Sequence, residues 1–241
     1  MIDLHCHILP GVDDGARTLD ESVAMARMAA AAGTRTIVAT PHMLHPQFHV
    51  PGELARRKLD DVRRAVSEAE IDIEIVLGGE IHYNAEVEER LATGELLPLC
   101  TTRRYILFEL PSTHVPSAFR DLVWRLQMNG IFPVLAHPER NMDFERNPDS
   151  IHEVRAAGVP IQVTAMSITG AFGRRAKKVA KRWIKQGVVD LVASDGHGPG
   201  RRPPVLDEAA RTIRKRGDST MEQWVTAEVP RRILAGEPVL G

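Results

Sequence analysis

Apolar residues occur along this chain in two patterns: short continuous runs, and longer stretches in which they recur every three or four positions. Most of the continuous runs lack the alternation of half-exposed strands and are typical of parallel strands buried on both faces. We predict seven strands from these runs, at residues 2–5, 35–40, 73–77, 105–110, 132–136, 160–164 and 188–193.

Several stretches between these runs have the spacing of amphipathic helices. Thr18 and Glu21 form a capping box that begins one helix, and Gly33 ends it. Two more helices are predicted to end at Gly130 and Gly187. Their expected buried stripes are Phe119, Leu122, Val123 and Leu126 in the first, and Val179, Ala180, Trp183 and Ile184 in the second.

Repeated strand–helix units predict a parallel α/β fold, either closed as a barrel or open and doubly wound. The chain has 241 residues, of which 43% are hydrophobic and 26% charged, an ordinary composition for a globular domain. We therefore expect a single domain over residues 1–241. Residues 203–241 show helical patterns without another clear strand, so they are predicted to pack outside the barrel.

The charge of the chain is nearly balanced, with a formal net charge of −1, and no nucleic-acid module is evident. We therefore expect no nucleic-acid partner. Between Arg174 and Arg216, however, there are 13 Lys and Arg residues against four Asp and Glu residues. This basic segment is either a solvated helix face or a docking face for an anionic partner.

Nothing in the sequence predicts a membrane segment or an exported protein. No apolar run approaches the ~18 residues that a spanning helix needs, and residues 1–20 lack a signal-peptide pattern. Cys6 and Cys100 have no metal-binding partner cysteine and are expected to be reduced thiols, with a disulfide between them as the alternative that spacing leaves open. We therefore expect a soluble, cytoplasmic protein.

Imidazole and carboxylate side chains follow six of the seven predicted strands, at or just after the carboxyl end. They are His5, His7, His42, Glu80, Glu109, His137, Asp195 and His197. Because the carboxyl ends of barrel strands converge on one face, where such enzymes place their active sites, these eight side chains are expected to lie together. The remaining histidines follow no predicted strand and are expected in loops or at the surface. They are His45, His49, His82, His114 and His152.

Such a cluster is costly to bury unless cations compensate its charges. Mixed His and carboxylate sets favour Mn, Fe or Zn over Mg or Ca. A carboxylate such as Glu80 can bridge two ions, and a multinuclear site suits displacement at phosphorus. Arg140 follows His137 closely and is a candidate phosphate ligand. Arg202 is a second candidate, with Arg201 as its alternative.

An ordered series of motifs contains these residues. It comprises Asp-Leu-His-Cys-His-Ile-Leu-Pro-Gly-Val-Asp-Asp-Gly (3–15), Ala-Thr-Pro-His (39–42), Gly-Gly-Glu-Ile (78–81), Phe-Glu-Leu-Pro (108–111), Ala-His-Pro-Glu-Arg (136–140), Phe-Gly-Arg-Arg-Ala-Lys-Lys (172–178), Ala-Ser-Asp-Gly-His (193–197) and Arg-Pro-Pro (202–204). The series resembles the PHP-superfamily protein-tyrosine phosphatases of bacterial capsule and exopolysaccharide operons. The resemblance extends over roughly residues 2–213.

The resemblance implies a distorted seven-stranded, TIM-like PHP barrel that holds two to three divalent ions, with Mn²⁺ expected and Fe or Zn as alternatives. It implies that the eight residues above are the metal ligands and that Arg140 and Arg202 contact the phosphate. Asp14 would be a further ligand or an orienting group, with Asp13 as the alternative. It also implies hydrolysis by metal-activated hydroxide of phosphotyrosine on the tail of a bacterial tyrosine autokinase in the cytoplasm.

The chain departs from the family pattern at two places. Met43 stands where the family has a second histidine, and Thr164-Ala165-Met166 stands where it has Asn-Ala-Gly. Neither departure removes a predicted ligand. Both are expected to line the mouth of the site, where they would affect substrate selectivity.

Three alternative functions use the same residues differently. The nearest is a PHP phosphoesterase that acts on a small molecule such as histidinol phosphate. A PHP exonuclease acting on DNA is less favoured, because the chain as a whole is not basic. A non-catalytic barrel that only binds the kinase tail would not need the complete ligand set.

Overall fold

The structure, a computed structural model, describes residues 1–99, 101–215 and 219–240. Its strands are short, and every pairing between them is parallel. They are β1 (Ile2–Cys6), β2 (Thr36–Ala39), β3 (His42–Met43), β4 (Glu74–Leu77), β5 (Glu80–His82), β6 (Tyr105–Glu109), β7 (Phe132–Leu135), β8 (Gln162–Thr164) and β9 (Leu191–Ala193). The predicted parallel α/β fold is confirmed.

Each predicted strand overlaps an observed one, and β3 and β5 are additional. β3 follows β2 after Thr40 and Pro41, and β5 follows β4 after Gly78 and Gly79. Proline has no N–H group to donate to a ladder. A Cβ on Gly79 would lie only 2.5 Å from Met43 Sδ, so this position admits no side chain without movement. These interruptions divide two continuous segments into pairs of short strands.

The predicted closed seven-stranded barrel is not confirmed. The described strands form three separate sheets, ordered β1-β2-β4, β3-β5-β6-β7 and β8-β9. Among the described residues, single bridges alone lie between these sheets, one from Cys6 to Gly196 and one from Leu135 to Ile161. The bridged residues Gly196 and Ile161 lie beyond the ends of β9 and β8, which have only three residues each.

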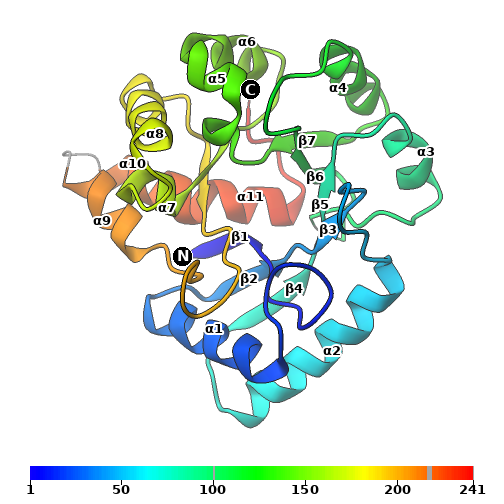
Figure 1. The fold of residues 1–241 in the computed structure, drawn as a ribbon, viewed down its shortest axis with the longest axis vertical. Helices are drawn as coiled ribbons and strands as arrows, with labels where there is room; N and C mark the ends of the chain where they lie inside the picture. The colour runs from blue at the N-terminus through cyan, green and yellow to red at the C-terminus, as the bar shows by residue number, and fades with distance from the viewer. Residues whose placement is uncertain (100, 216–218, 241) are drawn as a thin grey trace.

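Helices surround the strands in the view of Figure 1. They are α1 (Leu19–Ala31), α2 (Gly52–Glu68), α3 (Val87–Ala92), α4 (Phe119–Met128), α5 (Met142–Arg146), α6 (Ile151–Ala156), α7 (Ala165–Thr169), α8 (Arg174–Gln186), α9 (Asp207–Arg214), α10 (Ser219–Gln223) and α11 (Val229–Ala235). The buried residues of α4 and α8 include both predicted stripes. The predicted α1 is confirmed too, although only half of its capping box forms: Thr18 Oγ1 accepts from the Glu21 amide, while Glu21 accepts from the Arg17 amide.

A second, smaller core cluster lies between the strands and α11. Leu4, Leu107 and Leu191 come from β1, β6 and β9, and Val229 and Ile233 come from α11. All five side chains are fully buried. In Figure 1, α11 runs behind the strands, and the loops at their carboxyl ends lie toward the viewer. The last helix therefore closes the molecule on the side away from those loops.

Some sequence predictions concern the charged and cysteine residues. The basic side chains of α8 lie mainly on its exposed face. Cys6 is buried in the main core. The other cysteine, Cys100, lies outside the described residues, and so do Arg216 at the end of the basic segment and residues 217, 218 and 241 of the predicted C-terminal segment. Within the described part of the chain, no helix combines the length and the apolar composition required to cross a membrane.

Candidate metal centre

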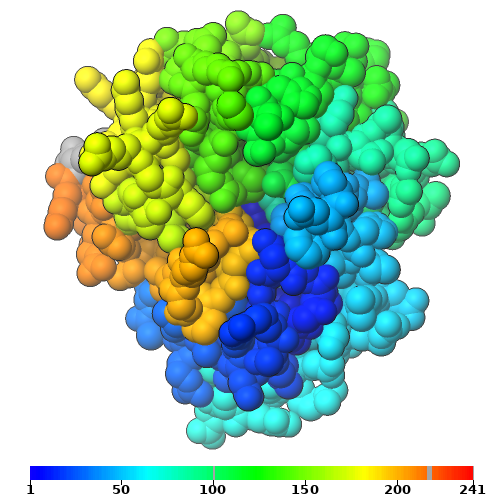
Figure 2. Space-filling model, viewed as in Figure 1, coloured from blue at the N-terminus to red at the C-terminus, as the bar shows by residue number. Residues whose placement is uncertain are grey.

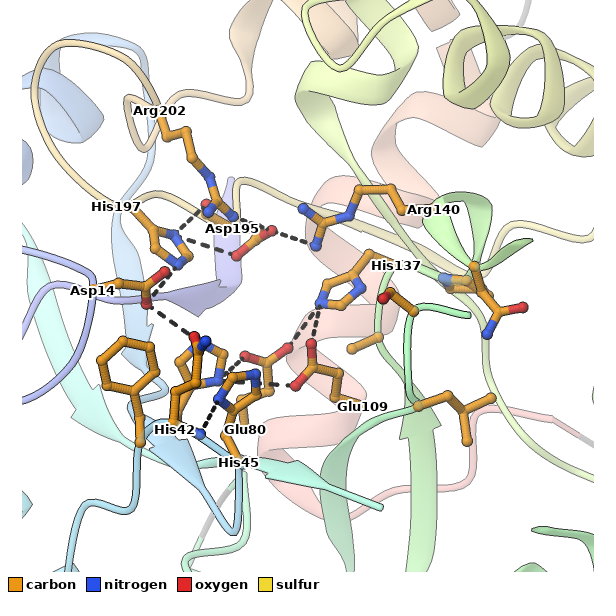
Figure 3. A pocket seen from close by; sticks show the side chains of 17 residues that line it. Asp14, His42, His45, Glu80, Glu109, His137, Arg140, Asp195, His197 and Arg202 are labelled. Atoms are coloured by element: carbon orange, nitrogen blue, oxygen red, sulfur yellow. Dashed lines mark hydrogen bonds and ion pairs between the residues drawn. The ribbon is translucent and has the colours of Figure 1, made fainter. Parts of the chain in front are cut away.

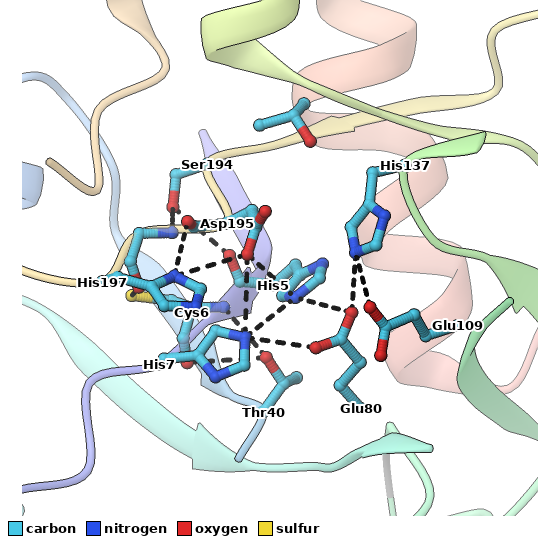
Figure 4. A network of polar contacts seen from close by, with 12 residues as sticks. His5, Cys6, His7, Thr40, Glu80, Glu109, His137, Ser194, Asp195 and His197 are labelled. Carbon is cyan, nitrogen blue, oxygen red and sulfur yellow. Dashed lines mark hydrogen bonds and ion pairs between the residues drawn. The ribbon is translucent and has the colours of Figure 1, made fainter. Parts of the chain in front are cut away.

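The eight predicted ligands lie together at the carboxyl ends of the strands (Figures 3 and 4). Glu80, on β5, is at their centre. Its Oε1 lies 2.8 Å from His137 Nε2 and 3.3 Å from His5 Nε2. Its Oε2 lies 3.0 Å from His42 Nδ1 and 3.3 Å from His7 Nε2. One buried carboxylate therefore contacts four imidazoles.

The local backbone explains these positions. Side chains alternate along an extended strand, so His5 and His7 face the same way and Cys6 faces the core. His5 Nε2 and His7 Nε2 are 3.1 Å apart. His42 and Glu80 are register partners in the pairing of β3 with β5, which places them side by side. The two strands that the sequence did not predict therefore position two of the ligands.

Four overlapping groups of imidazole and carboxylate atoms have the spacing of metal sites, with the ligand atoms of each group within 4.8 Å of one another. The groups are His7, Asp14, His42 and His197; His5, His7 and Glu80; His5, His137 and Asp195; and His42, Glu80 and Glu109. Because the groups share His5, His7, His42 and Glu80, the four candidate sites adjoin one another.

Buried atoms without a hydrogen bond indicate that this cluster fits cations. His42 Nδ1, Glu80 Oε2 and Glu109 Oε2 are buried, and none of them makes a hydrogen bond within the described residues, although His42 Nδ1 and Glu80 Oε2 face each other at 3.0 Å. A buried polar atom without a partner costs about 1–3 kcal/mol. A metal ion is the partner that would satisfy imidazole and carboxylate atoms together, and this donor set suits Mn, Fe or Zn.

Burial and neighbouring charges shift the pKa values of three groups in this cluster. Burial and the nearby Glu80 carboxylate raise the pKa of Glu109 to about 8. Burial and the positive charge of Arg140 lower the pKa of His137 to about 4. Burial disfavours the charged form of Asp195, but Arg140, His5 and Arg202 outweigh it and hold that pKa well below its usual range.

Two buried groups behind the cluster orient its imidazoles. Gln162 Oε1 lies 3.0 Å from His5 Nδ1, which leaves His5 Nε2 free to face the cluster. Asp13 Oδ2 lies 3.0 Å from His7 Nδ1 and also accepts the amide of His42 at 3.1 Å. Metal-binding histidines commonly have such partners on their second nitrogen. The sequence analysis missed Gln162; its position in the sixth predicted strand was the available signal.

Asp13 and Asp14 have different surroundings. Asp13 is enclosed by the bonds to His7 and His42 and a third to the amide of Gly15. Asp14 has a side chain that is 44% exposed, and its Oδ1 lies 3.3 Å from both His42 Nε2 and His197 Nε2. Gly15 lets this turn close, because a Cβ there would lie 2.1 Å from the backbone oxygen of His7.

The two candidate arginines converge on one carboxylate oxygen. Asp195 Oδ2 accepts from Arg140 at 2.6 Å and from Arg202 at 2.5 Å. The ring of Phe172 lies beneath both guanidinium groups, 4.8 Å from the Cζ of Arg140 and 5.4 Å from that of Arg202. Arg201, the alternative to Arg202, is exposed and is not among the residues that line the pocket.

The cluster lies at the base of a cavity of 310 Å³. In Figure 2, the dark blue N-terminal segment, the lighter blue loop after β3 and the orange loop after β9 meet around this opening. Asp14, His42, Glu80, Glu109 and His137 line it, and so do Arg140, Asp195, His197 and Arg202. His5 and His7 lie beneath, fully buried.

The expectation that Met43 and Thr164-Ala165-Met166 line the mouth is wrong. Met43 and Thr164 are fully buried, and neither they nor Met166 lines the pocket. Met43 instead packs in the core against Gly79. His45 lies in the loop after β3, as expected, and this loop turns back over His42, so that His45 also lines the pocket. His82, expected in a loop or at the surface, belongs to strand β5.

Comparison with known proteins places these features in context. Residues 1–235 match the family described as capsular polysaccharide synthesis, CpsB/CapC. The chain is 37% identical over 226 residues to the tyrosine-protein phosphatase YwqE of Bacillus subtilis, which covers 94% of this chain and 89% of the relative.

Two solved structures share the fold. One belongs to the crystal structures of YwqE from Bacillus subtilis and CpsB from Streptococcus pneumoniae, described as unique metal-dependent tyrosine phosphatases. It superposes with a TM-score of 0.92 and 33% identity over 99% of this chain and 96% of that one. A histidinol phosphate phosphatase from Lactococcus lactis superposes with a TM-score of 0.56 and 11% identity over 93% and 94% of the two chains. At that identity, the second match shows the fold alone.

Proposed function

We propose that this chain, which belongs to the CpsB/CapC family of capsular polysaccharide synthesis, is a metal-dependent protein-tyrosine phosphatase. Relatives and a solved structure with that activity cover nearly the whole chain. The observation that carries the proposal is the combination of the orphaned cluster atoms of His42, Glu80 and Glu109 with an adjacent arginine pair. Candidate metal ligands and candidate phosphate donors thus line the same pocket.

The proposed metal ligands are the eight side chains predicted from the strand ends. They are His5, His7, His42, Glu80, Glu109, His137, Asp195 and His197. We propose two to three ions, Mn²⁺ in the first place and Fe or Zn otherwise, and the overlap of the four ligand groups supports more than one. When bound, such ions supply Lewis-acid polarisation of phosphate oxygens and a water of lowered pKa. Asp14 is proposed as a further ligand, and Asp13 as the group that orients His7.

Arg140 and Arg202 are proposed to donate N–H groups to the phosphate. Their guanidinium groups already converge on one oxygen of Asp195, which shows that an anionic oxygen can be held by both. Phe172 holds the two planes in place. Preorganised donors of this kind stabilise the charge that develops on phosphorus-bound oxygens in the transition state.

The leaving group favours an aryl ester. The phenol of tyrosine has a pKa of about 10, so its phenolate needs little help from a general acid to leave. We propose phosphotyrosine on the tail of a bacterial tyrosine autokinase as the substrate, and the cytoplasm as the location. The family description, capsular polysaccharide synthesis, supports this assignment.

The proposal extends to the architecture, a single domain with a distorted seven-stranded PHP barrel. β2 with β3, and β4 with β5, would each count as one interrupted strand. Single bridges at Cys6–Gly196 and Leu135–Ile161 support contact between the three sheets. The helices of residues 203–241 would then pack outside the ring of strands.

Phosphate release from a phosphotyrosine peptide tests the function. Chelated protein should be inactive, and added Mn²⁺ should restore turnover. His137→Ala and Arg140→Ala should each abolish most of it, the first through the metal site and the second through the phosphate. Absence of turnover in the wild type despite bound metal would rule out the tyrosine-phosphatase proposal and direct attention to small phosphate esters.

A further inference from the structure

One wall of the pocket is a stack of rings. The ring centroids of His42 and His45 are 4.7 Å apart, those of His42 and Phe48 5.7 Å, and those of His45 and Phe48 5.6 Å. The His42 and Phe48 planes differ by only 10°. In Figure 3, His42 and His45 lie across the pocket from Arg140 and Arg202. The site therefore has a charged side and an aromatic side.

Backbone hydrogen bonds hold the loop that carries these rings. The amide of Val50 donates to the carbonyl of His42 at 3.0 Å, which closes the loop at its base. The amide of Phe48 donates to the carbonyl of His45 at 3.2 Å. The amide of Leu44 donates to His49 Nδ1 at 3.3 Å. The aromatic side is therefore a built part of the pocket.

Phe48 differs chemically from the other residues that line the pocket. It carries the one phenyl ring among the described residues that line the pocket. Both ring nitrogens of His42 face carboxylates, Asp14 on one side and Glu80 on the other. Phe48 has no polar atom to engage the metals or the phosphate, and it is only half-buried. Part of its apolar ring surface is thus available to a ligand.

We propose that Phe48, backed by His45, receives the aromatic ring of the phosphoester and so determines the preference for aryl over alkyl phosphates. This inference rests on the proposed phosphatase function. A phosphate held by the arginines and the cluster leaves its ester group to occupy the rest of the pocket, where Phe48 offers ring surface. Aromatic rings prefer offset or edge-to-face contact with one another, and such pairs stabilise beyond the burial of apolar area alone.

The test compares a substrate that has a ring with a ligand that has none. The KM for a phosphotyrosine peptide and the inhibition constant of inorganic phosphate are measured for metal-loaded wild type, Phe48→Ala, Phe48→Tyr and Gln47→Ala. Phe48→Ala should raise the KM about three- to tenfold and leave the inhibition constant unchanged. Phe48→Tyr should retain the wild-type KM. Gln47 lines the same pocket but has no ring, so Gln47→Ala is the matched control.

Each other outcome overturns the inference in a recognisable way. An unchanged KM in Phe48→Ala would show that the ring contacts no substrate. A parallel rise in the KM and the phosphate inhibition constant, with reduced bound metal, would show that Phe48 only supports His42. A wild type that does not hydrolyse the peptide would remove the phosphatase function itself, and the ring preference with it.

Discussion

One side-chain oxygen of Gln162 contacts two candidate metal ligands. Its Oε1 faces His5 Nδ1 at 3.0 Å and accepts the amide of His137 at 3.3 Å. Gln162→Met keeps the length of the side chain but removes this acceptor. We expect metal affinity to fall about 10–100-fold, as for other groups that orient metal-binding histidines. Titration of the apoprotein with Mn²⁺ measures it, and Gln162→Glu, which keeps an acceptor, should lose less.

Arg202 and Arg201 are neighbours with opposite surroundings, so they form a matched pair. Arg202 donates to Asp195 and lines the pocket, whereas Arg201 is exposed. Arg202→Ala should lower kcat/KM for a phosphotyrosine peptide by about 10²-fold, the scale for a lost charge-stabilising donor. Arg201→Ala should stay within about twofold of the wild type. Equal losses in both variants would assign the effect to surface charge instead.

The eight strand-end residues are the part of the site that the sequence predicts well, because a strand end fixes where a side chain points. Asp13 and Asp14 show the limit. Both belong to the same motif, and the tight turn at Gly15 leaves Asp14, not Asp13, among the residues that line the pocket. His45 is a similar case, since its place depends on a loop path that no periodicity encodes. Met43 was expected at the mouth because it follows His42, but alternation in β3 sends it to the core.

The breaks after β2 and β4 position the site. Each break begins a short strand, β3 or β5, whose first residue is a candidate ligand, His42 or Glu80. Sequence patterns predict the longer strands and the helices, because their apolar spacing is sustained over several residues. They do not predict β3 or β5, which are too short to show a period. They also do not predict how the sheets join, because that depends on single bridges.

The close approach of Gly79 to Met43 can be tested through stability. Gly79→Ala would place a Cβ 2.5 Å from Met43 Sδ, so the two segments must separate. We expect the free energy of unfolding to fall by about 1–3 kcal/mol, the usual cost of overpacking. Urea denaturation measures it. In a Met43→Ala background the added methyl group should cost much less, and an undiminished cost would contradict this packing.

Stability of the whole molecule should depend on metal, because the cluster joins residues from β1 to the loop after β9. An ion present at 100 times its dissociation constant adds about 2.7 kcal/mol. For a chain of this size, that corresponds to a rise of roughly 5–10 °C in Tm. Thermal unfolding with chelator and with Mn²⁺ measures the difference. His137→Ala should show a smaller shift, and an equal shift would place the stabilising ion elsewhere.

The position of α11 has a consequence for biosynthesis. Val229 and Ile233 complete the core cluster that also contains Leu4 and Leu107. Every candidate ligand precedes this helix in the chain, the last being His197. When the last candidate metal ligand, His197, has just emerged from the ribosome, the helix that covers the opposite side of the strands has therefore not yet emerged. Residues 229–235 must therefore emerge before the core cluster on that side can be completed.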